Sequence, residues 1–168
     1  MTDQPLYAEL GYTDAEWGLL AGLPQAVLTA ASAATPDGAR KTRAEGEAGR
    51  LEIADARASA NRLVAALAVA AVEQMGDPER GEEPPTIAPA DPEAYAADVL
   101  TRAGQATVLL REKAGQADAQ TYGHWLVEIA GAVIEAASTG GLLGLGGDLV
   151  TDRERDFRDD LAKAISGD

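Results

Sequence analysis

The sequence predicts an all-α fold: a single-domain bundle of five or six helices with an acidic, proline-rich linker near its middle. Alanine is abundant and apolar residues recur at three- and four-residue steps. Valine, isoleucine and threonine are not gathered in the alternating runs typical of strands. The chain has 168 residues and no cysteine, so it is long enough to bury a core without disulfides. We therefore expect residues 1–168 to form one domain.

The first helix is expected to begin at Thr13. The stretch TDAE has the capping-box pattern, in which the threonine hydroxyl accepts from the amide of Glu16 and the glutamate accepts from the threonine amide. Pro24 lacks an amide donor and its ring crowds the preceding turn, so we expect this helix to end or kink there. Because proline is favoured at the first position of a helix, a second one is expected from Pro24 to Ala34.

The longest helix is expected from about Arg50 to Met75. The polar run before it, residues 39–49, alternates charges and is typical of either a loop or a frayed helix. Within the long helix, apolar residues recur at the spacing of one helical face. That face is predicted to comprise Ile53, Ala56, Ala60, Leu63, Leu67, Ala70 and Ala71.

Residues 76–92, GDPERGEEPPTIAPADP, form the clearest linker. They hold five of the chain's eight prolines and mostly negative charge. This composition predicts an exposed connection without a regular helix.

Three helices are expected at and after the end of the linker. Asp91 should cap the first, with Pro92 in its opening turn, and Gly115 should end it. The most regular helix spans Ala117 to Ser138, and we expect it at the centre of the core. The last runs from Thr151 to Ile165, and its start, TDRE, repeats the capping-box pattern.

Charge and hydropathy exclude several kinds of partner. The formal net charge is −14, whereas binding to DNA or RNA phosphates needs clustered lysine and arginine. The longest apolar run, Leu63 to Val72, is about half the length of a membrane span. The N-terminus lacks the basic and apolar stretches of a secretory signal. We expect a cytoplasmic protein with no nucleic-acid or membrane partner, whose charge suits cations or basic protein surfaces.

A glycine-rich loop lies within the stretch STGGLLGLGGDLVTDRERD, residues 138–156. A phosphate cradle is disfavoured, because a helix rather than a strand precedes the loop and no P-loop lysine follows. Asp148 and Asp152 would also place negative charge beside the phosphate. The loop leucines either pack back on the bundle or, if exposed, form an apolar interface. They are Leu142, Leu143 and Leu145.

Acidic residues around the start of the last helix are candidate metal ligands. Asp148, Asp152 and Glu154 offer the oxygen atoms that a hard divalent cation prefers, although their spacing is not that of an EF-hand. The alternative is that these carboxylates complement the positive end of the helix dipole. We expect no other cofactor.

His124 is the single histidine, one helical turn before Glu128. A neighbouring carboxylate can orient a histidine as a base or as a metal ligand. The alternative is a partly exposed histidine without a chemical role. An enzyme built on His124 would need a polar pocket around it.

Part of the chain resembles known families. The segment WLVEIAGAVIEAASTGGLLGLGGDLVTDRERDFRDDLAKAI resembles the C-terminal part of small helical proteins of unknown function from bacteria with GC-rich genomes. It is more weakly similar to the TerB-like tellurite-resistance fold, an all-helical domain with an acidic segment linked to metal. Asp148, Val150, Thr151 and Glu154 match that segment, while Leu149 stands where the family has glycine.

The sequence therefore favours a non-enzymatic, cytoplasmic helical-bundle protein that acts through protein–protein contacts. Its expected partner is another protein or a second copy of the chain, in a homodimer. The alternative, which the TerB-like resemblance implies, is a divalent-metal-binding or stress-response module.

Overall fold

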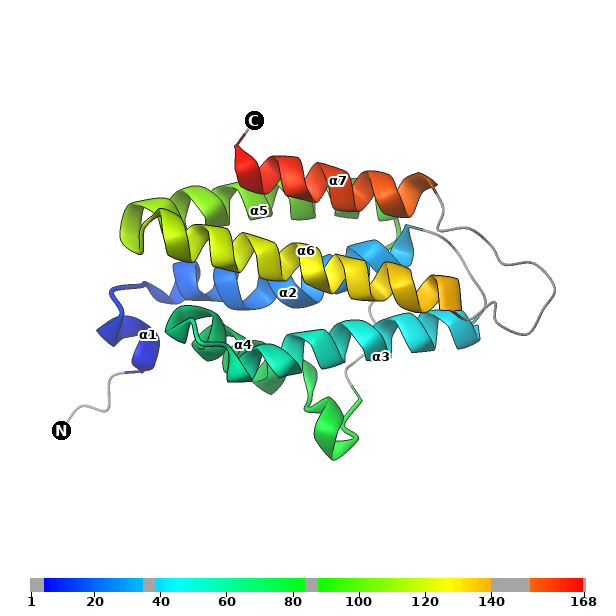
Figure 1. The fold of residues 1–168 in the computed structure, drawn as a ribbon, viewed down its shortest axis with the longest axis horizontal. Helices are drawn as coiled ribbons and strands as arrows, with labels where there is room; N and C mark the ends of the chain where they lie inside the picture. The colour runs from blue at the N-terminus through cyan, green and yellow to red at the C-terminus, as the bar shows by residue number, and fades with distance from the viewer. Residues whose placement is uncertain (1–4, 35–38, 84–87, 140–151, 168) are drawn as a thin grey trace.

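The computed structural model describes residues 5–34, 39–83, 88–139 and 152–167. The described residues contain helices and no strand, which confirms the all-α prediction (Figure 1). They form seven α-helices, more than the five or six expected, and two 3-10 turns. The helices are α1 (Leu6–Glu9), α2 (Asp14–Ala33), α3 (Ala39–Asp55), α4 (Arg62–Met75), α5 (Pro92–Lys113), α6 (Gln116–Thr139) and α7 (Asp152–Ser166); the turns are η1 (Ala56–Ala58) and η2 (Pro78–Arg80).

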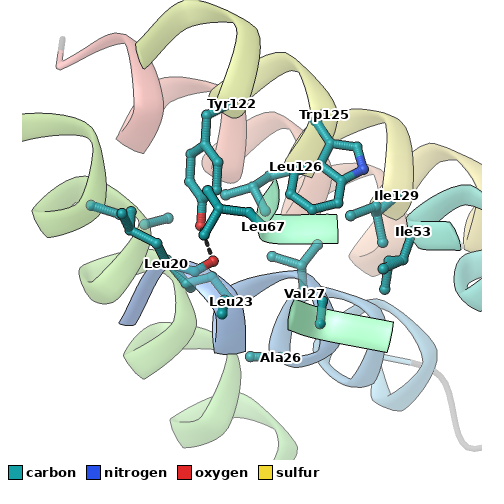
Figure 2. Close-up of a cluster of buried hydrophobic side chains, with 14 of the residues drawn as sticks. Leu20, Leu23, Ala26, Val27, Ile53, Leu67, Tyr122, Trp125, Leu126 and Ile129 are labelled. Atoms are coloured by element: carbon teal, nitrogen blue, oxygen red, sulfur yellow. Dashed lines mark hydrogen bonds between the residues drawn. The ribbon is translucent and has the colours of Figure 1, made fainter. Parts of the chain in front are cut away.

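The long helices lie in three layers. α2 and α6 form the middle layer, α5 and α7 cover one side of it, and α3 and α4 cover the other (Figure 1). α6 packs against α2, α3, α5 and α7. Its inward side chains are fully buried in the main hydrophobic cluster, among them Tyr122, Leu126 and Ile129 (Figure 2). α6 corresponds to the helix expected from Ala117 to Ser138, and its central position in the core confirms that prediction.

The predicted caps of α2 and α5 are present. The Thr13 hydroxyl accepts from the Glu16 amide at 3.2 Å, and the Glu16 carboxylate accepts from the Thr13 amide at 2.8 Å. The same carboxylate accepts from Lys113 Nζ at 2.6 Å, which joins the start of α2 to the end of α5. The Asp91 carboxylate accepts from the Ala94 amide at 3.0 Å.

The prediction that one helix ends at Pro24 and a second runs from Pro24 to Ala34 was wrong, because α2 continues through Pro24 to Ala33. In an α-helix the amide four residues later donates to each carbonyl, and Pro24 has no N–H to give to Leu20. The Tyr122 hydroxyl of α6 donates to that carbonyl instead, at 2.8 Å (Figure 2). Complete burial raises the pKa of the Tyr122 hydroxyl, so it keeps the proton that it donates. A residue 102 positions away thus supplies the donor that proline removes.

The single long helix expected from Arg50 to Met75 is instead two helices, and this split together with the short α1 raises the count to seven although two expected helices merge into α2. The polar run 39–49 is helical and belongs to α3, while η1 and Ser59–Asn61 separate α3 from α4. Asn61 caps α4 by accepting from the Val64 amide at 3.0 Å, and its side-chain amide donates to Asp118 of α6 at 2.7 Å. Ala60, assigned to the core face by the periodicity, is therefore exposed at the break.

The start of the expected linker is fastened to the bundle by Arg57. This guanidinium, which precedes α4, donates to the Asp77 carboxylate at 3.0 Å and to Glu79, both of which follow α4. It also donates to the Ala54 carbonyl at 3.0 Å, and we call these three contacts the Arg57 clamp. Burial alone would raise the pKa of Asp77, but the bonds from Arg57 and from the Glu79 amide outweigh it and lower the pKa.

Candidate functional site

The residues predicted to act in the glycine-rich loop cannot be placed. Leu142, Leu143, Leu145 and Asp148 lie outside the described residues, as does Thr151. The predictions of an interface at the leucines and of a metal ligand at residue 148 therefore stay predictions.

The other two candidate metal ligands lie in the first turn of α7. Asp152 is exposed, whereas Glu154 is only 2% exposed. Residues two apart on a helix point about 200° apart around its axis, so these carboxylates do not converge. Across residues 5–34, 39–83, 88–139 and 152–167, no group of three or more histidine, aspartate and glutamate residues lies close enough to hold a metal ion.

His124 lies on the outer side of α6 and has the neighbour that the spacing predicted. Its Nε2 is 3.0 Å from Glu128 Oε1, and its side chain is 73% exposed. Glu52 of α3 lies on the same side as Glu128. Burial raises the pKa of Glu52 most, and the nearby charge of Glu128 raises it further. This side of α6 is therefore acidic, and His124 faces water beside it.

His124 also stands at the rim of a cleft of about 410 Å³ between α5, α6 and α7. The cleft is lined by both apolar and polar residues. Its apolar lining includes Ala119, Gly123, Val127, Ala162 and Ile165, and its polar lining includes Thr107, Arg111, Gln116, Gln120, His124 and Ser166. The cleft has a volume in the range of small-molecule sites, and the exposed His124 contributes to its lining.

Two of the polar groups in this cleft already serve the fold. Arg111 Nη2 donates to the carbonyls of Ile165 and Ser166, at 3.2 and 3.0 Å, and so satisfies the C-terminal end of α7. The buried Thr107 hydroxyl donates to the Ala103 carbonyl of its own helix at 2.9 Å. A serine or threonine nucleophile must lie within hydrogen-bond reach of the base that activates it. In the described part of the chain His124 is paired with a carboxylate rather than with a hydroxyl.

A second candidate surface is the solvent-facing side of α4, which the sequence analysis did not identify. α4 packs against α2, α3, η1 and α6. Its buried side includes Leu63, Leu67 and Ala71. The opposite side carries Val69, which is 46% exposed and is bordered by half-buried alanines. We call this side the α4 outer face; it consists of Arg62, Ala65, Ala66, Val69, Ala70 and Glu73.

Periodicity did not reveal this face, because residues 63–72 are apolar all around the helix. A helical pattern identifies the outward side only where polar residues mark it. For the same reason Ala70 was expected in the core and is half-buried at the edge of the outer face.

The chain matches no protein-family model, no curated protein and no solved structure. In the part of the chain that the structure describes, no helix is both long and apolar enough to cross a membrane. A function must therefore be argued from the residues themselves.

Proposed function

We propose that this protein is a non-enzymatic helical bundle that acts through protein–protein contacts. The observation that carries the proposal is the α4 outer face. On a chain of net charge −14, this face presents three alanines and a half-exposed valine to solvent, with one arginine and one glutamate at its ends. Exposed apolar surface rimmed by polar residues is typical of protein interfaces. The occupant that best fits the face is a second copy of the chain, because the opposite charges at its two ends can pair with those of the same face.

The test compares two exposed valines. Val69 is 46% exposed on α4 and Val108 is 54% exposed on α5. We expect Val69→Glu to abolish self-association or partner binding, whereas Val108→Glu leaves both intact. Light scattering from micromolar to near-millimolar protein measures the first, and pull-down with each variant as bait measures the second. A wild-type chain that stays monomeric and retains no partner sensitive to Val69→Glu would contradict the proposal.

The alternative is a TerB-like divalent-metal or stress-response module that uses Asp148, Asp152 and Glu154. It is supported by the resemblance of this segment, in which Asp148, Thr151 and Glu154 match the acidic stretch of the TerB-like fold. A ligand that binds only the folded state stabilises it by about 2.7 kcal/mol at a hundred times its dissociation constant. Millimolar calcium or magnesium should then raise the melting temperature, and Asp152→Asn should reduce the rise. An unchanged melting temperature would eliminate this alternative.

A further inference from the structure

The six residues of the α4 outer face share one side of the helix. At about 100° per residue, Arg62, Val69 and Glu73 point in nearly the same direction. The three alanines flank that line. Arg62 and Glu73 are eleven positions apart, which places them about 16 Å apart along the helix axis. Within the described ranges, the side chain of neither residue hydrogen-bonds or forms an ion pair, unlike the arginine of the Arg57 clamp.

The six positions of this face are symmetric in the sequence about the midpoint between residues 67 and 68, because 62 and 73, 65 and 70, and 66 and 69 are equally distant from it. We propose that the face binds the same face of a second copy, with the two α4 helices antiparallel and a twofold axis passing between Leu67 and Ala68. This inference rests on the proposed function and names its partner. In that arrangement Arg62 lies opposite Glu73 of the second copy, Ala66 opposite Val69, and Ala65 opposite Ala70.

The twofold arrangement makes every contact occur twice. Two arginine–glutamate pairs close the ends of the contact, and the uncharged residues meet between them. Alanine at the contact lets the helix axes approach to the near end of the usual 8–10 Å range. Parallel helices would instead place arginine beside arginine and glutamate beside glutamate. Charge complementarity therefore selects both the second copy and its direction.

The overall charge opposes association, and it sets the expected salt dependence. Two copies of net charge −14 repel each other, but screening at physiological ionic strength limits this repulsion to about 8 Å. α4 itself carries one positive and one negative residue, so the contact helices are neutral. We expect a dimer that is weak at low salt, strengthens up to moderate salt, and then weakens as the ion pairs are screened.

The first experiment is sedimentation equilibrium of the full-length chain and its two valine variants. Val69→Glu places a carboxylate near the twofold axis and should raise the dimer dissociation constant by at least about tenfold, because like charges meet across the contact. Val108→Glu adds the same charge on α5 and should leave the dissociation constant unchanged. Circular dichroism checks that both variants remain helical. Equal dissociation constants for the two variants would overturn the inference.

The second experiment tests the direction of the helices by charge reversal. Arg62→Glu alone places glutamate opposite Glu73, and Glu73→Arg alone places arginine opposite Arg62. Each single variant should weaken the homodimer by about tenfold, because two attractive pairs become repulsive. The double variant restores both pairs with their signs exchanged and should dimerise like the wild type.

An equimolar mixture of the two single variants tests the ion pairs themselves, whereas the single variants test the direction of the helices. Every facing pair in the mixed dimer is complementary, so the mixture should dimerise although each variant alone does so poorly. A mixture that stays monomeric would overturn the antiparallel arrangement. If the wild type is monomeric throughout but a different protein binds and is lost on Val69→Glu, the second-copy inference fails and the proposed function stands. If no binding of either kind depends on Val69, both fail.

Discussion

α4 and α6 are both rich in apolar residues, but the residues that they expose to solvent differ in polarity. α6 buries aromatic and long aliphatic side chains on one side and exposes Gln120, His124 and Glu128 on the other. α4 also buries its long aliphatic residues, but it presents Ala66 and Val69 outward. An amphipathic helix such as α6 has its polar side in water and needs no further partner. A helix that is apolar all around leaves apolar side chains exposed to water on its outer side, and such exposed apolar surface is where we expect a partner to bind.

The largest predicted effect separates the inward side of α6 from the outward side of α4. Leu126 is fully buried, so Leu126→Ala should lower the free energy of unfolding by about 2–5 kcal/mol through lost contacts and a cavity. Val69→Ala, measured at concentrations where the chain is monomeric, should change it by no more than about 0.5 kcal/mol. Urea unfolding followed by circular dichroism measures both. A comparable loss for Val69→Ala would show that the α4 outer face is packed within the monomer.

A second prediction uses two glycines of α6. A Cβ atom built on Gly123 would overlap Ile165 Cγ2 of α7, whereas one built on Gly131 meets nothing within 4 Å. Gly123→Ala should therefore destabilise the chain by about 1–3 kcal/mol through overpacking. Gly131→Ala should stabilise it by up to about 1 kcal/mol, because alanine is the better helix former. Thermal melts of the pair distinguish a close helix crossing from a loose one, and equal shifts would contradict the close approach of α6 and α7.

The third prediction concerns the bond between α6 and the carbonyl that Pro24 leaves without a donor. Tyr122→Phe should cost about 1–3 kcal/mol, because it leaves the buried Leu20 carbonyl unpaired. In a Pro24→Ala background, the new amide can donate to Leu20, so the same substitution should cost less. A double-mutant cycle measures this coupling. Additive costs would show that the tyrosine hydroxyl does not replace the missing amide.

The fourth prediction concerns acid and the anchoring of α4. The pKa of Asp77 is lowered in the folded chain, so its contribution to stability is fully present above its unfolded value of about 3.9 and is lost as the pH falls through the lower folded value. Below about pH 4, amide exchange should therefore rise in α4 before it rises in α6. Asp77→Asn should remove most of this difference. Asp98→Asn, at an exposed position of α5, should leave the difference unchanged. Simultaneous loss of protection in both helices would contradict the role of the Arg57 clamp.

Features set within one helical turn were predictable from the sequence. The capping box at Thr13 and the cap at Asp91 follow from residues that act on their immediate neighbours, and the central position of α6 follows from its regular apolar face. The split between α3 and α4 also has a local signal, the cap at Asn61, but the continuous apolar run obscured it.

The other features depend on residues distant in sequence. Nothing near Pro24 indicates that Tyr122 will supply its donor. The cleft beside His124 exists only because α5 and α7 bring Arg111 and Ile165 next to α6. The α4 outer face could not be identified before the packing of α4 was known, since its uncharged residues match those of its buried side in polarity.

The bond from Tyr122 to Leu20 also bears on the order in which the chain can fold. During synthesis, α2 is complete about ninety residues before the tyrosine that pairs its central carbonyl has been added. Until then the proline leaves a gap in the hydrogen bonding of α2, so the nascent helix is marginal on its own. We expect the middle layer to form in one cooperative step once α6 arrives. A truncated chain that ends before α6 should therefore show little stable structure in α2.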